Sequence, residues 1–469
     1  MKRIVRVLAL TAVLVALLAV AAGAADFTHC ADALKELGLF QGSDQGYDLD
    51  RAPTRAEAAA MLVRLLGKEA EAKASTAYTA PFTDVADWAK PYVQYLYDNG
   101  LTNGKTATAF GYADRCTAQQ YAVFLLRALG YSDAAGGDFT YAAALDFARE
   151  KGVVDVLNCN AANFLRDDVA AMSYTALSVA PKSGEADLLT KLVSEGAVQD
   201  AKGYDKLFAG LRSFAAAQSA GDAGASAAKL DIEMDMKLAN VDYLSGKIAM
   251  DLAAVLDEKD PDQSKMAMDM DIDMAFTELA AQSMGLSAAD AKLQAALQCY
   301  YTDGALYLNM DGVKVRTPLS LAAVMPAGAV TAASAGPVSA VSSLEHTAAG
   351  GVDRYTITYA AHAMDRVVET AGAQAGAAGY SMGYDAMTVE MALRGGQLQS
   401  AKVDLAMHAA VEGMAMHMTA RVDLSGVKTG SAVQVRLPAD LSSYQNSAGG
   451  SYGVIGGADG PTSIFTTAG

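Results

Sequence analysis

Histidine and acidic side chains near the end of the chain are the first candidates for chemistry. His408 and His417 fall on neighbouring segments, beside Asp404 and Glu412. Imidazole and carboxylate groups are common ligands of transition metals, but a protein zinc site usually takes at least three of them. No third histidine lies nearby in the sequence, so we expect no metal and no cofactor.

A run of alternating aspartates offers a second candidate, a calcium site. Asp269, Asp271 and Asp273 alternate with apolar residues in Met266-Ala-Met-Asp-Met-Asp-Ile-Asp-Met-Ala-Phe276. Calcium needs several oxygen ligands wrapped around the ion, usually by a loop. Carboxylates on one strand face stand too regularly apart to wrap an ion, so a solvated face is the simpler interpretation.

The remaining reactive residues do not indicate an enzyme. The sequence contains no G-x-S-x-G, H-E-x-x-H or Walker A motif, and its five histidines are scattered. The four cysteines show no C-x-x-C spacing for zinc or redox chemistry, and we interpret each as a small buried residue. They are Cys30, Cys116, Cys159 and Cys299.

The histidines and aspartates lie in a segment whose apolar residues alternate with a period of two. This alternation recurs in residues 230–238, 247–252, 387–393, 403–407 and 414–424. One dry face and one wet face predict an antiparallel sheet covered on a single side. Asp-Gly pairs near residues 303 and 311 predict hairpin turns, whereas Thr277 to Leu297 has helical spacing.

Composition and the first residues limit where the protein can act. A formal net charge of −17 and a pI near 4.7 argue against binding to nucleic acid, which requires a basic patch. Lys2, Arg3 and Arg6 precede an apolar run that ends at Ala22-Gly-Ala24, the pattern of a cleaved signal peptide. A retained anchor is the alternative. No later stretch is apolar enough to span a bilayer, so we expect a secreted protein.

The first third of the chain contains an internal repeat. Each copy has a helix, a glycine-containing loop and a second helix with a capped start, as in Thr54-Arg-Ala-Glu57. Each copy exposes an apolar face that only its neighbours can cover, so three copies are expected to form one globule. The second helices of the three copies start near Thr54, Thr117 and Phe164.

The repeated motifs are F-x-D-V…W, then G-L-x-x-G, then T-R-A-E and a helix ending L-L-R-x-L-G. In this combination residues 27–183 resemble the S-layer homology (SLH) domain family. The resemblance implies a three-unit pseudo-trimer that docks on secondary cell-wall polysaccharide, often pyruvylated, in Gram-positive-type envelopes. It also implies grooves between units, lined by the arginine of T-R-A-E with an aspartate and a tryptophan of a unit's opening. A guanidinium suits a ketal carboxylate, and an indole suits a sugar ring.

Carried over to this sequence, the implied wall-polymer-binding residues are Arg55, Asp84, Trp88 and Arg166. No unit has the full set, because His29 replaces the aspartate in unit one and Ala118 replaces the arginine in unit two. Unit three keeps only the arginine. The resemblance therefore implies at most one composite groove, with Asp84 and Trp88 facing Arg55 or Arg166 of a neighbour. Purely structural roles for the tryptophan and the arginines are the alternative.

The alternating segment resembles the LolA/LppX-type lipoprotein fold, through its strand rhythm and the stretch Tyr300-Tyr-Thr-Asp-Gly-Ala-Leu-Tyr-Leu. The resemblance implies a curved half-barrel with an apolar cavity for a lipid or another lipophilic ligand. A solid methionine core is the alternative. Near the end, Gly456-Gly-Ala-Asp-Gly-Pro-Thr462 resembles a signature in the membrane subunit of sodium-pumping decarboxylases, without that subunit's membrane helices.

The predicted fold class is α+β multidomain, with an N-terminal all-α three-repeat globule and a C-terminal antiparallel sheet with helices. We expect a secreted, non-enzymatic protein of the cell wall or cell surface of a Gram-positive-type bacterium. Its alternatives are a structural or adhesive protein with a solid β spacer, and an unrecognised polysaccharide-active enzyme. The predicted parts are a signal peptide (1–25), three repeats (26–183, divided 26–70, 78–133 and 138–183), a connector (184–228), a β-rich domain (229–445) and a flexible tail (446–469).

Overall fold

The chain divides into two compact units. The computed structural model describes residues 26–42, 46–75, 77–155, 157–219, 225–257, 259–287, 291–321, 337–363, 365, 380–411, 414–446, 452–455 and 463–466. The helical unit contains residues 25–211 and 336–342, and the sheet unit contains residues 212–335 and 343–469. The predicted signal peptide lies outside the described residues. Within the described ranges, no helix has the length and apolar content needed to cross a bilayer.

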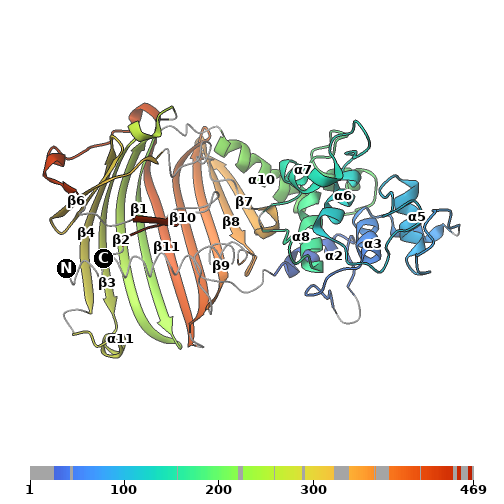
Figure 1. Cartoon of the computed structure of the whole chain (residues 1–469), viewed down its shortest axis with the longest axis horizontal. Coiled ribbons are helices and arrows are strands. Elements are labelled where there is room, and N and C mark those ends of the chain that lie inside the picture. The colour runs from blue at the N-terminus through green and yellow to red at the C-terminus, as the bar shows by residue number, and fades with distance from the viewer. Residues whose placement is uncertain are drawn as a thin grey trace. The chain divides into compact units, whose positions relative to one another are not determined.

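The helical unit contains the residues of the predicted repeats (Figure 1). Its helices are α2 (Thr28–Glu36), α3 (Arg55–Leu65), α4 (Glu69–Ala74), α5 (Lys90–Asp98), α6 (Ala118–Ala128), α7 (Ala144–Glu150), α8 (Arg166–Leu177) and α9 (Leu188–Ser194), with a 3-10 turn η1 (Tyr141–Ala143) before α7. Helix α10 (Tyr204–Ser219) spans the division between the units.

Side chains cap the second helix of each repeat. The predicted capping box of α3 is confirmed: the Glu57 N–H donates to Thr54 Oγ1 at 3.2 Å, and the Thr54 N–H donates to the Glu57 carboxylate at 2.7 Å. Thr117 and Gln120 form the same box at α6. At α8 the Asp168 carboxylate accepts the Leu165 N–H at 2.7 Å. These caps satisfy backbone donors that helix starts otherwise leave unpaired.

The three second helices, α3, α6 and α8, contact one another pairwise. Each also carries the first helix of another repeat: α5 packs on α3, α7 on α6, and α2 on α8. These contacts link the helices of all three predicted repeats. Each predicted repeat would then complete its core with a helix of a neighbour.

A short segment from much later in the sequence also belongs to the helical unit. Residues 336–342 join it, and their turn η3 (Val338–Ala340) packs on α8. Ser339, Ala340 and Val341 are at most 1% exposed. The Ser339 carbonyl oxygen lies 2.7 Å from His29 Nε2 and 3.4 Å from Cys30 Sγ. The predicted linear domain boundaries did not include this insertion, because it depends on contacts between residues about 300 positions apart.

The sheet unit is built on one twelve-stranded sheet. Its strands are β1 (Ala225–Leu238), β2 (Val241–Val255), β3 (Lys265–Phe276), β4 (Lys292–Thr302), β5 (Ala305–Met310), β6 (Val313–Pro318), β7 (Val341–Ala349), β8 (Val352–Tyr359), β9 (Tyr380–Arg394), β10 (Gln397–Val411), β11 (Met414–Thr429) and β12 (Gln445–Asn446). The order is β12-β6-β5-β4-β3-β2-β1-β11-β10-β9-β8-β7, so the sheet stays open (Figure 1). Pairing is antiparallel from β6 to β1 and from β1 through β11 to β8, whereas β12 pairs parallel with β6. Helices followed by a mostly antiparallel sheet confirm the α+β class.

The alternating pattern places apolar and acidic residues on opposite faces of the sheet. In β3, Ile272 and Met274 are 4% and 2% exposed, whereas the neighbouring Asp271 and Asp273 are exposed. Ile272 and Met274 form a core with Met234, Leu244 and Ile248. Further along the same face, Met266, Met268 and Met270 are only half-buried.

Three segments differ from the predictions. The helix expected over Thr277–Leu297 is only α11 (Glu278–Ser283), because residues from Lys292 pair with β3 as strand β4. Strand β1 begins at Ala225, inside the predicted connector, because it pairs along its whole length with β2. In the predicted flexible tail, β13 (Tyr452–Ile455) pairs with β14 (Ser463–Thr466), and the motif between them lies outside the described residues. All four cysteines are free thiols.

Candidate functional site

Arg55, the first residue of α3, is buried and ties the first repeat to the second. Its side chain is 6% exposed, and Nε donates to the Phe110 carbonyl oxygen at 2.9 Å. The guanidinium carbon lies 4.9 Å from the ring centres of both Phe110 and Phe124. Burial lowers the pKa of Arg55, but an arginine side chain stays charged in proteins. The charge is therefore stabilised by one carbonyl and two aromatic faces.

The backbone at the start of α3 forms part of the same connection. The Arg55 N–H donates to the Asp114 carbonyl at 2.8 Å, and the Ala56 N–H donates to the Tyr112 carbonyl at 3.1 Å. Free N–H groups at a helix start need such acceptors. The second predicted repeat supplies them, so hydrogen bonds connect the start of α3 to the loop before α6.

Asp84 holds the same loop from the other side. Its carboxylate accepts the N–H groups of Phe110 and Gly111, both at 2.7 Å. Burial alone would raise the pKa of Asp84, but these hydrogen bonds outweigh it and hold the pKa below the usual value. Arg55 therefore binds a carbonyl group of this peptide segment, and Asp84 binds two of its N–H groups.

Arg166, the first residue of α8, makes the equivalent connection between the third repeat and the first. Its Nε donates to the Tyr47 carbonyl oxygen at 3.0 Å. The backbone N–H groups of Arg166 and Asp167 donate to the carbonyls of Arg51 and Leu49, both at 3.0 Å. Burial lowers the pKa of Arg166 as well. Both predicted arginines thus bind backbone carbonyls of a neighbouring repeat.

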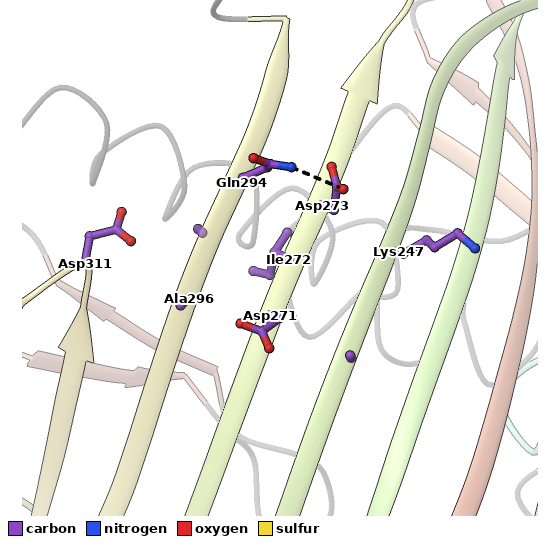
Figure 2. A pocket seen from close by; sticks show the side chains of 9 residues that line it. Lys247, Asp271, Ile272, Asp273, Gln294, Ala296 and Asp311 are labelled. Atoms are coloured by element: carbon purple, nitrogen blue, oxygen red, sulfur yellow. Dashed lines mark hydrogen bonds between the residues drawn. The ribbon is translucent and has the colours of Figure 1, made fainter.

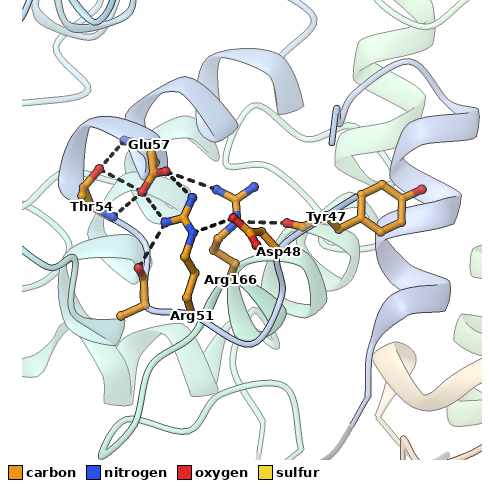
Figure 3. A network of polar contacts seen from close by, with 7 residues as sticks. Tyr47, Asp48, Arg51, Thr54, Glu57 and Arg166 are labelled. Carbon is orange, nitrogen blue, oxygen red and sulfur yellow. Dashed lines mark hydrogen bonds and ion pairs between the residues drawn. The ribbon is translucent and has the colours of Figure 1, made fainter. Parts of the chain in front are cut away.

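A polar network surrounds Arg166 and the start of α3 (Figure 3). Arg51 donates to both carboxylate oxygens of Glu57, at 2.9 and 2.6 Å, and to Asp48 at 2.8 Å. Arg166 lies 3.8 Å from the same Glu57 carboxylate. Burial opposes ionisation of Glu57, but the hydrogen bonds from Arg51 and Thr54 lower its pKa to about 2. Glu57 therefore serves as helix cap and as ion-pair partner at once.

Trp88 is linked through Tyr92 to a different part of α3. Its side chain is 52% exposed, and its ring centre lies 6.5 Å from that of Tyr92. The Tyr92 hydroxyl donates to Glu69 at 2.6 Å, and Glu69 in turn accepts a hydrogen bond from Arg64 at 3.0 Å. Arg64 lies nine positions beyond Arg55 in the helix, which at 1.5 Å per residue is roughly 14 Å away.

The structure thus brings two of the four predicted binding residues together. Arg55 and Asp84 meet at the segment from Phe110 to Gly111, Arg166 meets the loop at Tyr47, and Trp88 stands exposed beside Tyr92. The two arginines lie in joints between repeats instead of facing an open groove. Their assignment to polymer binding stays a prediction.

The acceptor carbonyls were missed by the sequence analysis, although a signal for them exists. The carbonyls that accept from the start of α8 and those that accept from the start of α3 fall at equivalent positions of the first two predicted repeats. They are offset by the same 63 positions that separate Thr54 from Thr117. The pairs are Tyr47 and Phe110, Leu49 and Tyr112, and Arg51 and Asp114. Aligning the loops before the capped helices would have found them.

A shallow groove of about 450 Å³ lies on the polar face of the sheet, across β2, β3 and β4 (Figure 2). Asp271 projects from β3 between Ala249 and Ala296, whose small side chains leave the depression around it. Asp273 accepts a 3.4 Å hydrogen bond from Gln294. Across the described residues, no group of three acidic, histidine or cysteine side chains is spaced to hold a metal ion. The groove is shallow and open.

The predicted pair of His408 and His417 lies directly opposite across β10 and β11. Asp404, however, accepts from Arg421 at 2.7 Å, and Glu412 lies outside the described residues. His408 Nδ1 lies 2.6 Å from Asp385 Oδ1 on β9 instead.

Comparison with known protein families matches one segment of the chain to a domain family. The sequence model of the S-layer homology domain matches residues 81–111, which include Asp84, Trp88 and the peptide that Arg55 holds. The chain therefore carries an S-layer homology segment in its second repeat.

Two particular proteins are similar to parts of the chain. The "Middle cell wall protein" of Brevibacillus brevis (strain 47) is 31% identical over 116 residues, which cover 24% of this chain and only 11% of that protein. A LolA superfamily protein from Nitrosomonas europaea aligns structurally over 49% of this chain and 96% of its own, with 11% identity and a TM-score of 0.15. That score is too low to carry an argument, so the LolA-type resemblance stays a prediction.

Proposed function

We propose that the helical unit attaches this protein to a polysaccharide of the bacterial cell wall, and that the sheet unit is displayed at the cell surface. The observation that carries the proposal is the S-layer homology match at residues 81–111. The similarity to a cell wall protein supports the same location. No catalytic step is part of the proposal.

The exposed surface around Trp88 supports contact with a sugar. Trp88 packs against Tyr92, and Arg64 and Lys73 lie 5.7 and 5.9 Å from the centre of the Tyr92 ring. Aromatic rings suit the apolar face of a sugar, and adjacent cations suit an acidic substituent such as a pyruvyl ketal. Arg55 and Arg166 support this surface indirectly, by fixing how the repeats pack.

Binding of the intact mature chain to isolated walls of its own bacterium tests this assignment. We expect Trp88→Ala to weaken binding by about 2 kcal/mol, or roughly 30-fold, as truncation of a central aromatic contact does. Tyr97→Ala is the matched control, because Tyr97 is an exposed aromatic residue, 41% accessible, on the adjoining helix α5. Equal binding by both variants would remove Trp88 from the site.

The half-buried methionines of the sheet favour a second candidate function. Met266, Met268 and Met270 present flexible thioether side chains on one face of β3, and such side chains adapt to apolar guests. We propose that this face binds a lipophilic ligand. Native mass spectrometry of the intact chain should detect a co-purified lipid, whereas its repeated absence would favour the solid spacer.

A further inference from the structure

Two histidines and two aspartates cluster in the sheet unit. His408 lies on β10 and Asp385 on β9, while His362 and Asp365 lie in the turn that follows β8. The His362 N–H donates to the Tyr384 carbonyl at 2.8 Å, which fixes the turn against β9. His362 has a left-handed backbone, with φ of +62°. That conformation is uncommon for a residue other than glycine and points to a local constraint.

Asp365 is the centre of this cluster. Its side chain is 3% exposed, and Oδ1 accepts the Tyr384 N–H at 2.7 Å. Its other oxygen, Oδ2, lies 3.2 Å from His362 Nδ1. One oxygen is therefore anchored to β9, and the other faces an imidazole.

Gly383 opens the space into which His408 reaches. A Cβ atom at this position would lie 2.7 Å from Asp365 Oδ2 and 3.0 Å from His408 Nε2. The carboxylate oxygen and the imidazole nitrogen thus converge over the glycine, and the ring centres of His362 and His408 are 5.5 Å apart. A larger residue than glycine would separate these groups.

The second nitrogen of His408 is already committed. Nδ1 lies 2.6 Å from Asp385 Oδ1, which favours the tautomer that carries its proton on Nδ1. Nε2 then carries a lone pair that can bind a metal ion. In metal sites, a ligand histidine usually donates the N–H of its other ring nitrogen to a carboxylate, which orients the ring.

We propose that His362 Nδ1, Asp365 Oδ2 and His408 Nε2 bind a divalent transition-metal ion of the Zn²⁺ type, with Asp385 as the orienting carboxylate. Two imidazoles and one carboxylate are a common donor set for such ions. Two ligand atoms at about 2.0–2.1 Å from a tetrahedral zinc are roughly 3.3 Å apart, close to the 3.2 Å between His362 Nδ1 and Asp365 Oδ2.

The third ligand must move to complete the site. In the described residues no three such groups are yet close enough to hold an ion, so His408 has to turn further toward Asp365. The side chains of His408 and His362 are 36% and 40% exposed, so dense packing does not enclose either ring, and His408 can rotate while Nδ1 stays near Asp385. The bound ion would pin the turn after β8 to β9 and β10.

Titration of the intact, untagged mature chain with Co²⁺ and then Zn²⁺ tests the proposal. We expect one saturable site per chain, a visible d–d absorption band with Co²⁺ and its loss on addition of Zn²⁺. His362→Gln and His408→Gln should each weaken binding at least tenfold, and Asp385→Asn by roughly 10- to 100-fold. His417→Gln is the matched control, because His417 is the exposed cross-strand neighbour of His408, and it should bind as the wild type does.

Two results would overturn the proposal. The absence of a saturable site would show that the cluster is held by hydrogen bonds alone. Loss of binding in His417→Gln but not in His362→Gln would place the ion between β10 and β11. If a variant does not fold, imidazole NMR shifts of the wild-type chain decide the question: Zn²⁺ should perturb His362 and His408, and perturbation of His417 instead would contradict the assignment.

Discussion

Replacing Arg55 by alanine tests whether this arginine holds the repeats together. The variant loses a charged hydrogen bond to Phe110, worth about 1.5–3 kcal/mol, and two buried contacts between guanidinium and aromatic rings at 4.9 Å. It also relieves the cost of burying a charge. We expect a net loss of about 3 kcal/mol. For a domain of about 150–250 residues each kcal/mol corresponds to roughly 2–4 °C, so Tm should fall by roughly 6–12 °C.

The single tryptophan makes this assay specific. Trp88 is the only tryptophan of the chain and lies in the helical unit, so its fluorescence follows the unfolding of that unit. Arg149→Ala is the control, because Arg149 is 50% exposed and pairs with the exposed Asp146, and such a surface pair is worth little. Below its Tm, Arg55→Ala should keep wall binding within about threefold. An unchanged Tm with lost wall binding would refute the reasoning and return Arg55 to the binding surface.

Two further predictions concern the helical unit. The folded state holds the pKa of Glu57 near 2, below its usual value of 4.5, so stability present above about pH 4.5 should be lost as the pH falls toward 2. The free energy of unfolding is measured by urea titration at pH 3 and pH 6. Allowing for screening at this partly exposed side chain, Glu57→Gln should make the difference between the two pH values smaller by about 1–2 kcal/mol. An unchanged pH dependence would contradict the assignment. Ala340→Asp places an unpaired carboxylate at a residue that is 0% exposed, which should cost about 3 kcal/mol or more. The unfolding transition that Trp88 fluorescence reports should therefore move to a lower temperature, although residue 340 lies far from Trp88 in the sequence. Destabilisation of the sheet unit alone would contradict the placement of residues 336–342 in the helical unit.

Local patterns made several elements predictable. The capping box of Thr54 and Glu57 depends only on residues three positions apart, and the structure confirms it. The alternation of methionine and aspartate from Met266 to Phe276 predicted strand β3 and its two faces. The alternation from Lys292 to Leu297 was misread as helical, because its apolar residues fit both spacings and only pairing with β3 decides between them.

Contacts between distant residues could not be predicted in this way. The burial of Ser339 against His29 depends on two segments that no local pattern connects. The cluster of His362, Asp365 and His408 likewise depends on the turn after β8 lying against β9 and β10. The family resemblance located Arg55 and Asp84, but it did not show that both side chains bind the backbone of one loop, at Phe110. Their polymer-binding role stays a prediction.

Sedimentation of the intact mature chain with cell walls tests the central claim most directly. Walls are compared before and after chemical removal of their non-peptidoglycan polysaccharide. Attachment through the helical unit predicts saturable binding to the untreated walls and little binding to the stripped walls. Equal binding to both preparations, or binding to neither, would contradict it.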